Sequence, residues 1–262
     1  MADPNELLRI GDLDGARSAL VEMVRRKPQD APTRMFLFQL FAVRGEWDKA
    51  KLQLETLAKL SEGAAMLAVA YGQAIEAERI RNRAFQGKID VHVHVGAGGW
   101  VDLLAQSIAC HSRGDHAHGN ELRDAAFDQA ADTPGEIDGT AFDWIANADA
   151  RFGPAFEAII GGTWGIVPFD AVERIECAGV RDLRDIVWFP VQIAFKSGQS
   201  VAAMLPARYP GTESSGNAAE RLARATNWSD SAAGSVGIGQ QIFSLSSGSD
   251  VDLLSLRLLK FA

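Results

Sequence analysis

The sequence predicts an α+β fold, with a helical domain over residues 1–160 and a small antiparallel, β-rich and barrel-like domain over residues 161–262. Three observations support this prediction. The first third of the chain contains a repeat with helical spacing, helical patterns continue to about residue 160, and short apolar runs follow them. The length fits, because a chain of 262 residues can bury one large core or two small ones.

The repeat has an offset of 34 residues. "GDLDGARSAL" from Gly11 aligns with "GEWDKAKLQL" from Gly45, which places Ala16 opposite Ala50. A period of 34 residues, with glycine at the turn and alanine where two helices cross closely, is typical of tetratricopeptide repeats. We therefore expect tetratricopeptide-like helix pairs over residues 1–86, stacked so that they leave a concave face.

The helix between the two repeat signatures, "APTRMFLFQLFAVRG", carries the predicted binding face. By the repeat alignment, one face of this helix lines the groove at intervals of four residues and carries Met35, Gln39 and Val43. This face suits an apolar helix from a partner. A charge there would lose its water on binding, so we expect Val43→Asp to abolish binding while the fold stays intact.

Further helices are expected after the repeat. A long helix is predicted over about 61–85, with Ser61 as its cap, and a helical pair over about 100–112 and 118–130. Another helix is predicted to start near Pro154, a good first-turn residue, and to end at the Gly-Gly pair that follows.

The β-rich part consists of short apolar runs bounded by Gly, Pro, Asp or Ser. Five or six short strands are predicted from "TWGIVPF", "VERIEC", "DIVWFPVQIAF", "SVAAMLPA", "QQIFSL" and "VDLLSLRLLKF". "KSGQ" at 196–199 predicts a tight hairpin, and residues 207–235 are expected to form a polar connection with one helical piece at about 217–226. This pattern is typical of a strongly curved antiparallel sheet or barrel.

Composition limits the classes of function. The net charge of −8 argues against a nucleic-acid partner. The N-terminus does not resemble a signal peptide, and "AAMLAVA" at 64–70 is too short to span a bilayer, so no membrane partner is expected. Two isolated cysteines, Cys110 and Cys177, fit a reducing cytoplasm. No nucleotide-binding or nucleophile motif is present, and we expect no cofactor.

The histidines support an alternative reading. "IDVHVHVGAGGW" at 89–100 places Asp90 and two histidines on alternate positions, as in the first strand of many metal-dependent hydrolases on β/α barrels. However, no histidine follows residue 118, and the rest of the chain lacks eight strand–helix units. We therefore predict no enzyme, no catalytic residue and no metal ligand, with a metal-dependent hydrolase as the alternative. A structural or adventitious zinc site also remains open, and the candidate residues are His92, His94, His111, His116 and His118.

A second acid–base candidate is the pair Asp143 and Asp149, which lies near Arg151. Two carboxylates could act as general acid and base. On a helix their spacing of six residues puts them on different faces, so helix capping and an ion pair with Arg151 are the favoured interpretation.

Several blocks of the sequence resemble the ImpE family, also called SciE or TagJ. The resemblance covers nearly the whole chain, and the blocks that carry it are "MFLFQLFAVRGEWDKAKLQL", "TPGEIDGTAFDWIANADARFGPAFEAIIGG", "VPFDAVERI", "DLRDIVW", "LPARYPGT" and "NW". The resemblance implies a non-enzymatic, cytoplasmic accessory protein of the bacterial type VI secretion system. It implies binding to the small subunit of the contractile sheath through an amphipathic helix of that subunit, with an indirect link to the AAA+ ATPase that recycles the sheath. The family has a short acidic piece before the equivalent of Trp100, so the "VHVHV" histidines lie outside the family pattern.

Overall fold

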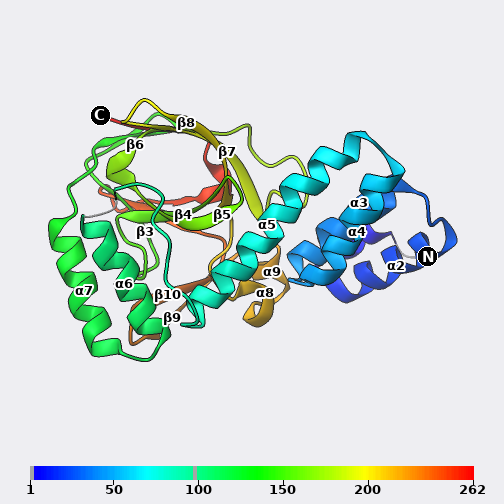
Figure 1. The fold of residues 1–262 in the computed structure, drawn as a ribbon, viewed down its shortest axis with the longest axis horizontal. Helices are drawn as coiled ribbons and strands as arrows, with labels where there is room; N and C mark the ends of the chain where they lie inside the picture. Colours follow the sequence, from blue (N-terminus) through cyan, green and yellow to red (C-terminus); the bar gives the residue numbers. More distant parts are fainter. Residues whose placement is uncertain (1–2, 97–98) are drawn as a thin grey trace.

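The computed structural model describes residues 3–96 and 99–262, and these form an α+β fold with helices first and strands after them (Figure 1). This order confirms the predicted fold class. The helices are α1 (Pro4–Arg9), α2 (Leu13–Arg26), α3 (Ala31–Val43), α4 (Trp47–Leu60), α5 (Gly63–Phe85), α6 (Trp100–Ser112), α7 (His116–Gln129), α8 (Thr212–Ser215) and α9 (Ala218–Arg221), with 3-10 turns at Phe169–Ala171 and Leu253–Ser255.

The helical repeat is present as expected. Gly11 and Gly45 both have positive φ, +82° and +67°, a conformation that glycine adopts without strain after a helix. Ala16 and Ala50 have no exposed surface, which is consistent with two closely packed helix pairs. Neighbouring helices from α1 to α5 pack against each other in chain order.

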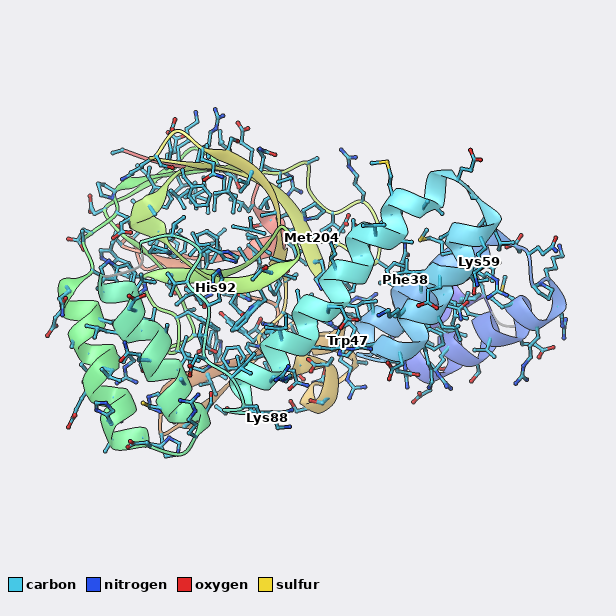
Figure 2. The ribbon with its side chains drawn as sticks, viewed as in Figure 1. Phe38, Trp47, Lys59, Lys88, His92 and Met204 are labelled. Atoms are coloured by element: carbon cyan, nitrogen blue, oxygen red, sulfur yellow. The ribbon has the colours of Figure 1, made fainter. Side chains whose placement is uncertain are left out.

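Helix α5 extends from the repeat to the strands, as the cyan helix in Figure 1 shows. It begins at Gly63, and no side chain caps its N-terminus, so Ser61 is not the cap that the sequence predicts. Phe38 and Trp47 lie next to α5 (Figure 2), and Tyr71 of α5 contacts both Phe38 and Trp188 of the sheet. Aromatic rings of this size bury much area, so the cluster holds the repeat against the strands.

The main sheet has eight antiparallel strands in the order β2-β1-β13-β6-β7-β8-β4-β5. It is strongly curved (Figure 1), but among the described residues the edge strands β2 and β5 do not pair with each other, so the sheet is open rather than a closed barrel. A separate three-stranded sheet has the order β12-β11-β3. The strands are β1 (Gly135–Ile137), β2 (Thr140–Phe142), β3 (Ile145–Asn147), β4 (Ala155–Ile160), β5 (Thr163–Pro168), β6 (Val172–Glu176), β7 (Trp188–Phe195), β8 (Ser200–Pro206), β9 (Thr226–Ser231), β10 (Gly234–Gly239), β11 (Ile242–Leu245), β12 (Asp250–Asp252) and β13 (Leu258–Phe261).

Three regions differ from the sequence-based expectation. Residues 135–160, expected to be helical, form β1 to β4, and Pro154 precedes a strand rather than a helix. The end of the polar connection expected over residues 207–235 instead contains β9 and the start of β10, which pair with each other. The run at 251–261, predicted as one strand, forms β12 and β13 of two different sheets, with a 3-10 turn between them. The other predicted strands and the hairpin at 196–199 are confirmed. Helices α1 to α7 thus precede the strands, and the short helices α8 and α9 lie between β8 and β9. The division into two domains at residue 160 stays a prediction.

The histidine-rich segment before α6 covers one edge of the sheet. The amide of His94 donates to Ile166 of β5, and the amide of Ile166 donates to His92, at 3.1 and 2.9 Å. The segment therefore runs parallel to β5 and satisfies backbone groups that an edge strand leaves open. Among the helices that the structure describes, none is long and apolar enough to cross a membrane.

Candidate partner-binding surface

The three residues predicted to bind a partner lie at different depths of α3. Met35 is half-buried, Gln39 is 8% exposed and Val43 has no exposed surface. Contrary to the expectation from the repeat alignment, Val43 does not line an open groove. That any of the three contacts a partner stays a prediction.

The cover over Val43 comes from the far end of the chain. Nη1 of the buried Arg208 donates to the backbone oxygens of Val43 and Arg221, both at 2.7 Å. Burial lowers the pKa of Arg208 to about 10, so its guanidinium stays charged at neutral pH. The side chain of Glu213 lies directly against Gly45, which has no Cβ to obstruct it. Residues 208–221 therefore close the C-terminal end of α3.

Gln39 lies at the wall of a hollow of about 450 Å³ that remains open. The hollow is formed by α1, α3, the loop before β7 and the segment after α9. Most of its lining is apolar, and Val180 at its edge is 43% exposed. The residues that line it are Asn5, Leu8, Phe36, Gln39, Val180, Asp182, Leu183, Ile186, Leu222 and Arg224.

The loop that forms one wall of this hollow is fixed by Asp185. Its buried carboxylate accepts hydrogen bonds from the amides of Arg181 and Asp182 at 2.8 and 3.2 Å. On the opposite side, Nη1 of Arg224 donates to the backbone oxygen of Arg9 at 2.9 Å. These bonds give the hollow defined walls, and burial raises the pKa of Asp182 at its rim. The arrangement can accept apolar side chains between a few polar rim groups.

Sequence reasoning missed the contribution of this loop, because Val180 and Leu183 follow α3 by more than 130 residues. The sequence does contain a local sign of this loop's role. Apolar residues recur at intervals of three, at Val180, Leu183 and Ile186, in a segment that is otherwise rich in charges. That spacing indicates a shared face but does not identify the element that it faces.

A buried charge network joins α5 to the sheet behind this surface. Nε and Nη2 of Arg81 donate to Glu157 of β4 at 2.7 and 2.6 Å, and Nη1 donates to Glu78 at 3.3 Å. Burial raises the pKa of Glu78. Burial also opposes the positive charge of Arg81, but the carboxylates of Glu157 and Glu78 outweigh this effect and raise the pKa of Arg81. Indole groups of Trp164 and Trp188 donate to Glu157 and Glu78. With all partners buried, the network positions α5 and is closed to a substrate.

Four of the described histidines form two separate pairs rather than one metal centre, and His118 lies beside Glu121. The rings of His92 and His94 lie 4.8 Å apart, and those of His111 and His116 lie 5.6 Å apart. Within the described residues there is no group of three or more His, Cys, Asp or Glu side chains placed to hold a metal ion. Burial lowers the pKa of His94, whose Nε2 lies 3.2 Å from the backbone oxygen of Ala158.

The carboxylates at 143 and 149 do not form an acid–base pair. Asp149 is fully buried and accepts from Arg151 at 2.6 and 2.8 Å and from the amide of Gly237 at 2.9 Å. The predicted ion pair with Arg151 is thus confirmed. The predicted helix is wrong, because Asp149 follows β3 and its carboxylate organises a turn, while Asp143 is exposed.

Comparisons with known proteins agree with one another. The model of a family described as ImpE protein matches residues 139–260. A curated relative, the type VI secretion system accessory component TagJ of Pseudomonas aeruginosa, is 37% identical over 256 residues, which is 98% of this chain and 90% of the relative.

A solved structure has the same fold. The crystal structure of the protein VPA1032 from Vibrio parahaemolyticus superimposes with a TM-score of 0.88 at 21% identity, over 100% of this chain and 98% of that chain. At this identity the likeness supports the arrangement of helices and strands alone.

Proposed function

The chain belongs to the ImpE family, and from this premise we propose that it is a non-enzymatic accessory component of a type VI secretion system that binds the small subunit of the contractile sheath. The name of the Pseudomonas relative describes an accessory component of that system. The sheath subunit as partner follows from the family resemblance. A link to the recycling AAA+ ATPase would then be indirect, through the sheath, and the proposed place of action is the cytoplasm.

The open hollow beside α3 is the observation that carries this proposal. An amphipathic helix binds a groove through a few apolar anchors, which are buried while polar residues remain at the rim. The hollow offers Phe36 and Leu183 within its lining and Val180 at its edge, with Asp182 and Arg224 as polar neighbours. It has room for anchoring side chains of a helix that lies across α1 and α3.

This surface revises the sequence-predicted site while keeping part of it. Gln39 lines the hollow, and Met35 lies one helical turn before it on the same face of α3. Val43 is excluded as an anchor, because the segment containing Arg208 covers it. We therefore propose Phe36, Gln39 and the loop residue Val180 as the centre of the binding surface.

The charge of the chain and the surroundings of its histidines and buried carboxylates support a non-catalytic role with a protein partner. The net charge of −8 disfavours nucleic acid as a partner. Four of the described histidines lie in two separate pairs, and the buried carboxylates of Asp149 and Glu157 are engaged in structural bonds, which favours a binding role over catalysis.

The test is titration calorimetry of the full chain with a peptide that contains the N-terminal helix of the small sheath subunit. Val180→Asp should weaken binding at least about tenfold, because an unpaired charge buried against an apolar helix costs several kcal/mol. The control is Val69→Asp on α5, which is 63% exposed and lies outside the hollow. If both variants bind like the parent protein, the hollow is not the binding surface. If the parent protein does not bind the peptide, the proposed partner is wrong.

A further inference from the structure

The turn between α6 and α7 brings two imidazole nitrogens face to face. Nδ1 of His111, near the end of α6, lies 3.3 Å from Nδ1 of His116, the first residue of α7. Their rings are nearly parallel, with planes 29° apart. Both side chains line a hollow of about 400 Å³ that opens to solvent. Neither the family resemblance nor the proposed function gives these two residues a role.

We propose that His111 and His116 bind one divalent transition-metal ion, such as Zn²⁺ or Cu²⁺, through their Nδ1 atoms, with water completing the coordination shell. Two nitrogens, each about 2.0–2.1 Å from a tetrahedral Zn²⁺, lie about 3.3–3.4 Å apart. The observed separation matches that edge. Imidazole is a suitable ligand for both metals, and Cu²⁺ is expected to bind more tightly than Zn²⁺.

The position of His111 is prepared by a glycine inside α7. A Cβ at Gly119 would lie 2.8 Å from Cδ2 and Nε2 of the His111 ring, so only glycine leaves room for the ring there. Glycine in a helix interior costs about 1 kcal/mol relative to alanine. The need to accommodate the His111 ring therefore explains why glycine occupies position 119, although glycine is unfavourable inside a helix.

Nδ1 is the nitrogen of the His111 ring that faces the second histidine. Nε2 of His111 is buried and has no hydrogen-bond partner among the described residues. Without a metal ion, the two Nδ1 atoms can form a single N–H···N bond, in which one nitrogen donates and the other accepts. A metal ion instead uses both lone pairs.

Two arginines near the site each have a carboxylate partner. Arg151, which lines the same hollow, is paired with Asp149, and Arg123 is paired with Asp124. Since the described residues provide no third protein ligand, the shell remains open to water. A metal ion bound there would connect the end of α6 to the start of α7 and would have no catalytic role.

The test uses the full chain, purified without a polyhistidine tag and treated with chelator. Calorimetric titration with ZnCl₂ should show one site per chain, and Cu²⁺ should give an electron paramagnetic resonance spectrum with nitrogen ligands. His116→Ala should weaken binding at least about tenfold, since even loss of an outer-shell partner costs a metal site 10–100-fold. His116 is exposed, so this variant should fold like the parent protein.

His118→Ala is the matched control, because His118 is also exposed, lies two residues further along α7 and contacts Glu121. It should bind metal like the parent protein. A metal-induced rise in the melting temperature should appear in the parent and control proteins and be absent in His116→Ala. Equal affinity in His116→Ala and the parent protein, or an equal loss in both variants, would show adventitious binding elsewhere and overturn the proposal.

Discussion

Val43 has no exposed surface, and its backbone oxygen is tied to Arg208. Val43→Asp should therefore destabilise the fold by several kcal/mol, because the carboxylate would be buried without a partner. This replaces the expectation that a charge there leaves the fold intact. The measurement is urea unfolding, with Met35→Asp, at a half-buried position of the same helix, as the milder comparison. Equal unfolding midpoints for the Val43 variant and the parent protein would show that Val43 is accessible.

Ala50 tests the packing of the helical repeat. Its side chain has no exposed surface, so Ala50→Leu should overpack the helix crossing and lower the free energy of unfolding by about 1–3 kcal/mol. Glu55→Leu, at an exposed position of the same helix, is the control and should change stability little. Thermal melting compares the two. A melting temperature unchanged by the Ala50 substitution would argue against a close crossing.

His94 gives a prediction for the dependence of stability on pH. Burial is the main cause of its lowered pKa in the folded state. Stability from the neutral imidazole is therefore present above the unfolded pKa of about 6.5 and is lost as the pH falls through the lower folded pKa. His94→Gln should lose less stability than the parent protein between pH 7 and pH 5, as measured by urea unfolding. The same slope in both proteins would exclude His94 as a source of acid sensitivity.

At the scale of elements, α5 is the connection between the repeat and the sheet. Its Arg81 holds Glu157 of β4 in a buried ion pair. Arg81→Met should cost about 3–5 kcal/mol, because removing one partner leaves a buried carboxylate without its cation. Adding Glu157→Gln should recover part of the loss, since the uncompensated charge is then gone. If the single substitution costs less than about 1 kcal/mol in urea unfolding, water reaches Glu157 and the junction is looser than described.

The helices were more accessible to sequence reasoning than the strands, for physical reasons. A 34-residue repeat with Gly11 and Gly45 in equivalent turns is a local signal, and it gave the helix pairs. The strands in 135–160 are mostly three residues long, too short for a clear alternation. The Asp138-Gly139 turn, with φ of +48° and +86°, is a hairpin signal in this stretch that the sequence analysis did not use. The cover over Val43 depends on Arg208, a contact that no local pattern encodes.

At the scale of the molecule, one core runs through the helices and into the sheet. A single cluster of buried residues includes Leu8 of α1, Ile75 of α5, Trp188 of β7 and Leu222 beside α9. A second cluster fills the inside of the curved sheet, around Phe169. Helix α5 passes between the repeat and the sheet in Figure 1, and its buried face belongs to the shared core. The repeat and the strands therefore depend on each other for burial.

This shared core leads to a prediction for unfolding of the whole chain. Far-ultraviolet circular dichroism follows mainly the helices, and tryptophan fluorescence includes the signals of Trp164 and Trp188 in the sheet, which have no exposed surface. If the core couples both parts, the two signals should change at the same urea concentration. Trp188→Ala should shift both transitions together by about 3–5 kcal/mol, since it opens a cavity where Tyr71 and Phe38 meet the sheet. Trp144→Ala, at a side chain that is 41% exposed, should shift neither by much. Two separate transitions, with only the fluorescence change moved by the Trp188 substitution, would instead mean that the helical and β-rich parts fold as independent domains.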